Sequence, residues 1–167
     1  YNTFTPLQMC YYISTLANKG KKTDVTIIKD IIKADGTSDD VEKIKVDIDK
    51  KLGLDEIINE DIEISKSTTI NAIFEGMRSV TGDHGGTVYG TFSDFPIEVA
   101  GKTGTATSGN GSDNAWFVGF APYDDPEIVI AVVIEHGANS HFAAKVARDV
   151  FDSYMELKEN RLNPDYK

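Results

Sequence analysis

The sequence predicts an α+β domain in which an antiparallel sheet is flanked by helices. Three strand-like runs follow one another at 97–107, 115–121 and 128–135, with short turns between them. Short connections pair consecutive strands antiparallel, because parallel neighbours need a long crossover. Helical patterns lie before and after these runs, so we expect the sheet to be sandwiched between helices.

The first helix has a clear start signal. Thr5 can cap it, Pro6 suits the first turn, and Gln8 can close a capping box. Apolar residues recur at helical spacing up to Ala17, and Gly20 fits the C-terminal stop.

The next stretch is polar and predicts a less regular structure. Residues 25–33 and 41–49 favour strand, with Asp35-Gly36 as a turn, which predicts a two-stranded ribbon. Residues 50–64 are acidic and weakly patterned, so we expect short helical turns and loop with a solvated face.

Two further helices are predicted. One begins at 67 or 68 and ends by 82, because its apolar residues have i, i+3, i+4, i+7 spacing: Ile70, Ile73, Phe74 and Met77. A glycine-containing loop follows at 83–86. The other helix runs over 140–158, with an apolar side formed by Phe142, Val146, Val150, Phe151 and Tyr154, and a polar tail follows it. Between the two, residues 128–134 are apolar without alternation, so we expect both faces of that strand to be covered.

The composition fits one acidic, folded domain. Of the 167 residues 40% are hydrophobic, and the formal net charge is −10. An acidic surface repels phosphate, which argues against nucleic-acid binding. Cys10 is the only cysteine, which excludes an internal disulfide and a cysteine-built zinc knuckle; it lies in mid-helix among apolar residues, so we expect a buried, inert thiol.

The run Val99-Ala100-Gly101-Lys102-Thr103-Gly104-Thr105-Ala106 carries the chemistry. Lys102 supplies a fixed positive charge on a strand, and the Thr103 and Thr105 hydroxyls can bind a substrate carboxylate. Gly104 leaves no side chain between strand and substrate. The backbone N–H of Thr105 can point at a developing oxyanion, so the run suits acyl transfer.

The run 99–106 has two alternative interpretations, a phosphate-binding loop and a structural lysine. Gly101-Lys102-Thr103 matches the end of a phosphate-binding loop, but Pro96 stands where that loop needs a glycine, and a strand replaces the required helix. This argues against nucleotide binding. Lys102 can also be a purely structural lysine, with its stem packed along a strand.

With these residues the chain resembles the penicillin-binding proteins and the serine β-lactamases that share their fold. Their signature set is Ser-x-x-Lys, Ser-x-Asn and Lys-Thr-Gly, in that order. The chain is most similar to the class B, elongation-type transpeptidases over nearly its whole length, thinning between about 37 and 64 and after Tyr154. The stretches that carry the match are 5–18, 75–78, 85–90 and 100–106, and 115–122 and 135–137 extend it.

The resemblance implies the C-terminal part of that fold and peptidoglycan cross-linking. In the family a serine attacks the D-Ala-D-Ala bond of a stem peptide, an amine then takes the acyl group, and β-lactams trap the serine. Lys102 matches the lysine that binds the terminal carboxylate and polarises the Ser-x-Asn serine. Thr103 and Thr105 match the hydroxyls that hold this carboxylate beside Gly104, and the Thr105 N–H completes the oxyanion hole.

The sequence departs from the family at the nucleophile. No Ser-x-x-Lys occurs in it, and Ser-x-Asn occurs only after Lys102, at 108–110 and 112–114, where these are ordinary turn residues. We therefore expect a partial domain over 1–160 that lacks its N-terminal segment, with a polar tail at 161–167. The serine and its base would lie before Tyr1, the chain alone would be inactive, and the strand at 128–134 would lack its family neighbour.

The resemblance also implies a setting. The parent would be anchored in the bacterial membrane with this domain on the extracytoplasmic face, meeting stem peptides, β-lactams and membrane proteins of the elongation machinery. A β-lactam-binding sensor without turnover is the alternative, and a hydrolytic β-lactamase fits the matches less well.

Some side chains allow more than one role. We expect no cofactor. His84, His136 and His141, with Cys10 or Asp83, are candidate zinc ligands, but no metal-ligand spacing supports them, and zinc at the Asp83-His84 loop is the less favoured alternative. We expect His136 to bond locally. Of Trp116 and Phe117, one should face the core and the other can line the cleft, and Tyr89 and Phe92 can shape its rim.

Overall fold

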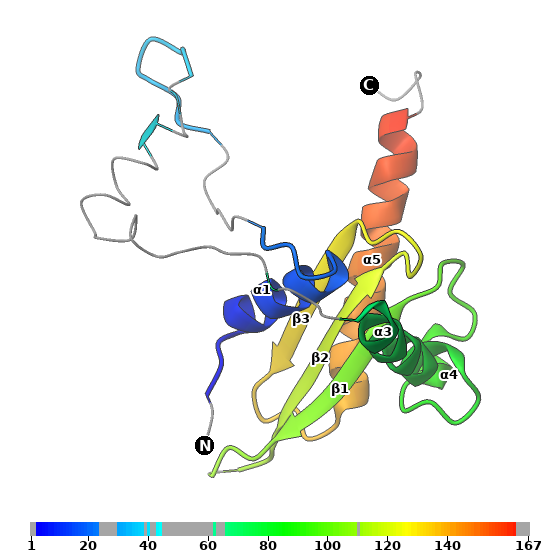
Figure 1. Cartoon of the computed structure of the whole chain (residues 1–167). Coiled ribbons are helices and arrows are strands. Elements are labelled where there is room, and N and C mark those ends of the chain that lie inside the picture. The colour runs from blue at the N-terminus through cyan, green and yellow to red at the C-terminus, as the bar shows by residue number, and fades with distance from the viewer. Residues whose placement is uncertain are drawn as a thin grey trace.

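A computed structural model describes residues 3–23, 30–38, 40, 43–44, 62, 66–109 and 111–162. Its centre is an antiparallel sheet of β1 (Ala100–Ala106), β2 (Asn114–Ala121) and β3 (Ile128–Ile134), in that spatial order (Figure 1). The predicted strands and their antiparallel pairing are confirmed. None of the described helices is both long enough and apolar enough to cross a bilayer.

Helix α1 (Pro6–Ala17) begins where the sequence predicts. The Thr5 hydroxyl accepts from the Gln8 N–H at 3.2 Å, and the Gln8 side chain accepts from the Thr5 N–H at 2.8 Å, which completes the capping box. The helix ends at Ala17, and the Gly20 N–H then donates back to the Thr15 carbonyl at 2.8 Å with Gly20 at φ 97°. Glycine adopts that left-handed conformation without steric strain.

Helix α3 (Ser67–Gly82) is also confirmed, and it buries Ile70, Phe74, Met77 and Thr81. Ile73, predicted on the same face, is instead 40% exposed and borders a small apolar groove beside Tyr12. The short helix α4 (Tyr89–Phe92) was not predicted. One turn of helix has too little periodicity to stand out from a loop.

Helices cover both faces of the sheet, as Figure 1 shows. Helices α1 and α3 lie on one face, where Phe74 and Phe120 pack with ring centroids 4.9 Å apart. Helix α5 (Ser140–Leu162) lies on the other face and ends four residues beyond the predicted 158. The sheet therefore separates two apolar clusters, one on each side.

The side of α5 that packs on the sheet agrees only in part with the predicted one: Phe151 is fully buried, as predicted, but three other predicted residues are exposed. Phe142, Val146 and Val150 are 54%, 44% and 42% exposed. The residues that pack on the sheet are mostly small: Ala143, Ala144, Ala147 and Phe151, all fully buried. Alanine lets a helix approach a sheet closely, so packing selects the alanine face over the one with larger side chains.

Strand β3 is covered on both faces only in part. Helices α1 and α5 contact it from opposite sides, but each of its residues stays half-buried. Among the described strands β2 is its only neighbour, so its other edge leaves the side chains partly accessible.

The predicted ribbon over 25–33 and 41–49 falls mostly outside the described residues, and so does nearly all of 50–64. What is described there is an antiparallel bridge between Ile32 and Ser38 around a turn with Gly36 at φ 81°, which fits the predicted turn. Residues 163–167 also lie outside the described part, and the division into 1–160 and a tail stays a prediction.

Candidate active site

Lys102 and Gly104 lie on the face of β1 that α1 and α3 flank. Lys102 is opposite Val118 and Gly104 is opposite Trp116 in the β1–β2 register. Directly opposed residues share one face of a sheet, and Val118 packs in the cluster with α1 and α3. The Lys102 side chain is exposed, and its Nζ donates to the Thr103 carbonyl at 2.8 Å. A Cβ on Gly104 would lie 3.4 Å from the Trp116 Cβ.

Thr103 and Thr105 lie on the opposite face of the same strand. Thr103 is opposite Phe117 and only 9% exposed, whereas Thr105 is opposite Ala115 and exposed. Period-two alternation separates both from Lys102. The structure thus brings Lys102 and Gly104 to one surface and leaves Thr105 open at the strand end, while Thr103 is enclosed. The substrate contacts of all four residues stay predictions.

Trp116 and Phe117 lie on opposite faces of the sheet, and Phe117 is the one that faces the core, while a cleft role for Trp116 stays a prediction. Phe117 is fully buried on the α5 side and stacks on Phe92, with ring centroids 5.7 Å apart. Trp116 is half-buried and lies on the face of Lys102 and Gly104. The sequence alone did not decide between them, because both are large and adjacent.

Contacts at both ends of the β1–β2 hairpin position the motif. At the start of β1, the fully buried Thr81 hydroxyl bonds the Val99 carbonyl and ties α3 to the strand. At the other end, the His136 N–H donates to Asn114 Oδ1 at 3.0 Å, and His136 Nδ1 lies 3.0 Å from the Ser112 carbonyl oxygen. The prediction that His136 bonds locally is wrong, because its partners lie 22 and 24 positions earlier in the chain. The hairpin is held by contacts at both of its ends.

Of the two Ser-x-Asn triplets, the described residues lie in the connection from β1 to β2, apart from Asn114, which begins β2. The Ser108 hydroxyl donates to the Ser112 carbonyl at 3.1 Å, and Gly109 and Gly111 have φ of 78° and 86°. These are turn interactions, so the turn interpretation is confirmed for the described residues of this segment.

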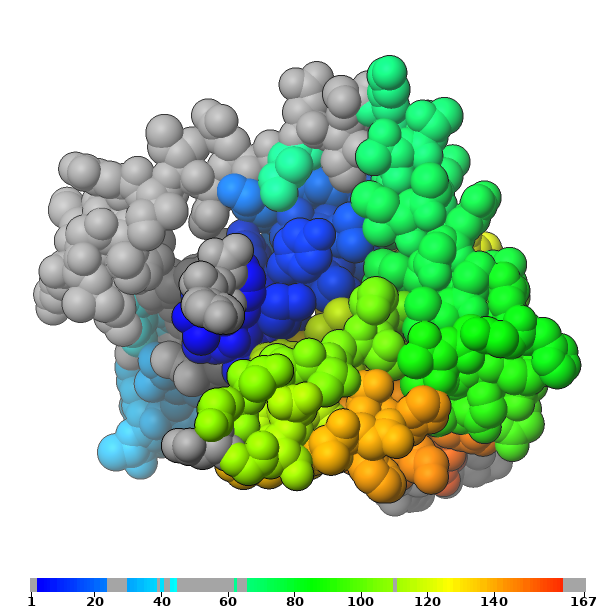
Figure 2. Space-filling view, turned by 90° about the horizontal axis from the view of Figure 1, so that it is seen from below, coloured from blue at the N-terminus to red at the C-terminus, as the bar shows by residue number. Residues whose placement is uncertain are grey.

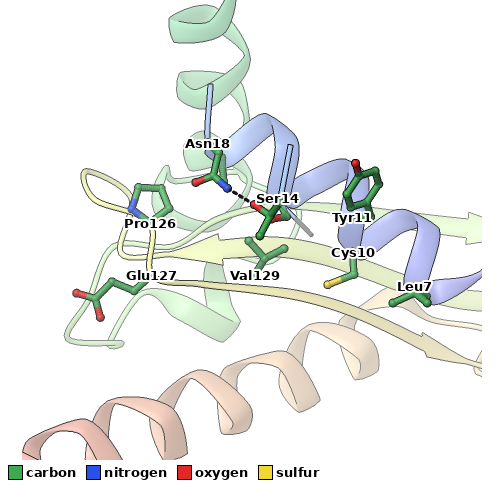
Figure 3. A pocket seen from close by; sticks show the side chains of 10 residues that line it. Leu7, Cys10, Tyr11, Ser14, Asn18, Pro126, Glu127 and Val129 are labelled. Carbon is green, nitrogen blue, oxygen red and sulfur yellow. Dashed lines mark hydrogen bonds between the residues drawn. The ribbon is translucent and has the colours of Figure 1, made fainter. Parts of the chain in front are cut away.

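Cys10 is half-buried rather than buried. It lines a pocket of about 300 Å³ between α1 and the start of β3, with Ser14, Asn18, Glu127 and others (Figure 3). Burial raises the pKa of the Cys10 thiol. None of the residues 102–105 lines this pocket.

The candidate zinc ligands do not form a cluster in the described part of the chain. No group of three or more His, Cys, Asp or Glu residues there could hold a metal ion. The His84 ring lies 4.6 Å from the Tyr89 ring, while Cys10 is on α1. That the chemistry needs no cofactor stays a prediction.

Figure 2 shows α1, the β1–β2 hairpin and α3 together on one face of the molecule. A sheet flanked on both faces by helices, with Lys-Thr-Gly on an outer strand, is the arrangement expected of a penicillin-recognising serine acyltransferase. The chain belongs to the penicillin binding protein transpeptidase domain family, whose match covers residues 2–156. The resemblance seen in the sequence is confirmed.

Comparison with individual relatives narrows the family assignment. The chain is 33% identical to Peptidoglycan D,D-transpeptidase MrdA of Haemophilus influenzae over 174 residues, which cover 95% of this chain and 25% of that protein. It is 28% identical to Penicillin-binding protein 2A of Bacillus subtilis over 179 residues, covering 96% and 23% respectively. The chain thus spans about a quarter of the length of these relatives.

Solved structures agree with the sequence comparison. PBP2 of Pseudomonas aeruginosa, solved in complex with WCK 5153, has a TM-score of 0.67 at 27% identity over 98% of this chain and 32% of that one. Penicillin-binding protein 2B of Streptococcus pneumoniae has a TM-score of 0.68 at 25% identity over 92% and 25%. The fold is that of the C-terminal part of a class B transpeptidase domain.

Proposed function

We propose that this chain is the C-terminal part of a peptidoglycan D,D-transpeptidase that cross-links stem peptides through an acyl-serine intermediate and is trapped by β-lactams. One observation carries the proposal: Lys102 and Gly104 of a family Lys-Thr-Gly motif share the open face of an outer strand. The named function of the H. influenzae relative supports it.

The serine and its activating lysine come from a part of the protein outside this chain, because no Ser-x-x-Lys occurs within it. The serine Oγ attacks the carbonyl carbon between the two D-alanines, and its proton passes to the base. The C–N bond then breaks, and the terminal D-alanine leaves with a proton on its nitrogen. An amine of a second stem peptide attacks the ester, which releases the serine and forms the cross-link. The chain alone is inert.

The role of Lys102 is electrostatic. Its ammonium is exposed at the open face and can move from the Thr103 carbonyl to a substrate carboxylate or to the serine of the missing Ser-x-Asn. An oriented positive charge beside the developing oxyanion stabilises the transition state more than the ground state.

Thr105 supplies the oxyanion N–H. In an antiparallel strand the N–H and C=O of one residue point to the same side, and this direction repeats every second residue. The contact of Lys102 Nζ with the Thr103 carbonyl supports an outward direction for that carbonyl. The Thr105 N–H then points outward as well, beside Gly104, where no side chain blocks the approach.

The two threonine hydroxyls differ in what they can do. Thr105 is exposed, so its hydroxyl can reach a substrate carboxylate around the strand edge. Thr103 is 9% exposed and opposite Phe117. The Thr103 hydroxyl can reach the substrate carboxylate only at the outer edge of β1. We therefore assign the main carboxylate contact to Thr105.

The setting of the reaction follows from the substrate. Peptidoglycan lies outside the cytoplasmic membrane, so the domain acts on the extracytoplasmic face of that membrane. The whole protein is anchored there by a segment outside this chain. Membrane proteins of the elongation machinery are its proposed partners.

The test is intact-mass spectrometry of the whole protein after exposure to a penicillin. Wild type gains one drug mass, and Lys102→Ala gains it about a hundredfold more slowly. Lys145→Ala is the matched control, because this exposed lysine lies on α5, across the sheet. A wild-type protein that gains no mass, or equal rates for the two lysine variants, would contradict the proposal.

A further inference from the structure

The turn between β3 and α5 is hydrogen-bonded to the end of the β1–β2 hairpin where the two strands are connected; we call these contacts the clasp. Besides the two bonds of His136 to Asn114 Oδ1 and to the Ser112 carbonyl, the Ala138 N–H donates to the Asp113 carbonyl at 2.9 Å. Three consecutive hairpin residues are thus bonded to a segment more than twenty positions away in sequence.

The backbone of this turn is held in an unusual conformation. His136 and Ala138 have φ of 55° and 56°, which residues other than glycine rarely adopt. Gly137 between them leaves no room for a side chain, because a Cβ there would lie 2.9 Å from the Ile134 Cβ and 3.0 Å from the Ala115 Cβ. Such conformations persist only where the surroundings enforce them, and they concentrate at functional sites.

The His136 ring is fitted to the hairpin. Its Nδ1 faces a carbonyl oxygen, which can only accept, so Nδ1 is the protonated nitrogen. A Cβ on Gly111 would lie 3.2 Å from Nδ1 and 3.4 Å from Cε1. The ring therefore lies close over a residue that has no side chain, at φ 86°.

What the turn holds is the end of the motif strand. The last paired residues of the β1–β2 ladder are Thr105 with Ala115 and Ala106 with Asn114. Among the described strands β1 has no neighbour on its outer edge. The position of Thr105 relative to β2 therefore depends on the connection that closes the hairpin directly beyond it. The His136 turn bonds the last residues of that connection, and the Ser112 carbonyl that faces His136 also accepts from the Ser108 hydroxyl on the β1 side.

We propose that His136 is a positioning residue for acylation, which through Ser112 and Asn114 fixes the end of β1 and so the backbone N–H and hydroxyl of Thr105. This rests on the proposed function. A donor aimed at a developing oxyanion accelerates the reaction only if its place is set before the reaction begins. Loss of the imidazole bond would loosen Thr105 without touching Lys102.

Two substitutions separate the side-chain bond from the backbone conformation. His136→Asn keeps an N–H donor near the place of Nδ1, and asparagine tolerates the left-handed region. His136→Gly tolerates that region equally well but has no donor. The pair is compared in the whole protein by two readouts: the acylation rate constant with a penicillin, and amide hydrogen exchange of peptides that cover 104–116.

We expect His136→Gly to exchange faster in these peptides and to acylate about fivefold more slowly, at unchanged non-covalent affinity for the drug, because one hydrogen bond is lost. His136→Asn should stay within about twofold of wild type in both readouts. If amide hydrogen exchange of these peptides is unchanged in His136→Gly, the claim that the His136 turn holds the hairpin end is wrong. Faster exchange with an unchanged acylation rate would overturn the positioning role. Absence of wild-type acylation would defeat the proposed function and the positioning role, while exchange would still decide the clasp.

Discussion

Gly119→Ala should disrupt the sheet, because β1 lies too close to Gly119 for a side chain there. Gly119 pairs with Gly101, and a Cβ on Gly119 would lie 2.6 Å from the Ala100 carbonyl oxygen and 3.2 Å from the Gly101 Cα. It would also lie 3.0 Å from Phe117 Cε1. Two of these three neighbours are backbone atoms of the motif strand, which cannot move aside without shifting β1.

The size of the effect follows from this geometry. Added atoms in a packed core destabilise by about 1–3 kcal/mol when side chains can adjust, so a backbone clash should reach about 3 kcal/mol. At about 2–4 °C per kcal/mol for a domain of 150–250 residues, and less for a larger one, the unfolding midpoint should fall by up to about 6–12 °C.

The assay is thermal unfolding of the whole protein, with acylation by a penicillin as a second readout. Gly104→Ala is the matched control, because its Cβ would meet only the Trp116 Cβ, at 3.4 Å. We expect the unfolding midpoint of Gly104→Ala to stay within about 2 °C of the wild-type value. Its acylation should nevertheless be slower, because the added methyl group would lie where the substrate approaches β1. Equal midpoints for wild type and Gly119→Ala would refute the close approach of the two strands.

Three further predictions concern other parts of the fold. Thr81→Val should destabilise by about 1–3 kcal/mol in urea unfolding, because the Val99 carbonyl would lose its buried donor; an unchanged midpoint would show that the bond is dispensable. The Arg148 hydrogen bond lowers the pKa of Asp94 below its ordinary 3.8, so the stabilisation by this pair is present above that pH and lost as the pH falls through the folded-state pKa. Asp94→Asn should therefore be less stable than wild type at pH 7 and equal to it in strong acid, whereas a difference that persists in acid would exclude the charge as its cause. Burial raises the pKa of the Cys10 thiol, so iodoacetamide should alkylate it more slowly at pH 8 in folded than in unfolded protein, and equal rates would contradict this.

Local signals predicted the elements, and tertiary packing decided their orientation. The capping box at Thr5 and the turns between the strands are local, so the sequence located them well. Which side of α5 packs on the sheet depends on the shape of the opposite surface. The pattern favoured large residues such as Phe142, whereas the sheet accepts Ala143 and Ala147.

The candidate site was predicted in the same uneven way. The motif and its strand could be recognised from 99–106 alone. The clasp at His136 could not, because it joins segments far apart in the sequence and depends on left-handed residues that no local pattern announces. Gly137 was the one available signal, as a glycine directly after a strand often marks a special backbone conformation.

Side chains along β1 alternate between the two faces of the sheet, so neighbouring residues of the motif differ in how freely they can be substituted. Lys102 is exposed and Gly104 is half-buried on the same face, so a small substitution at either position should leave folding nearly intact. Thr103 is enclosed opposite Phe117, and a bulkier residue there would strain the core before it reached any ligand. Under the proposed function, selection by β-lactams should therefore change the accessible positions 102, 104 and 105, whereas the fold itself should keep Thr103 constant.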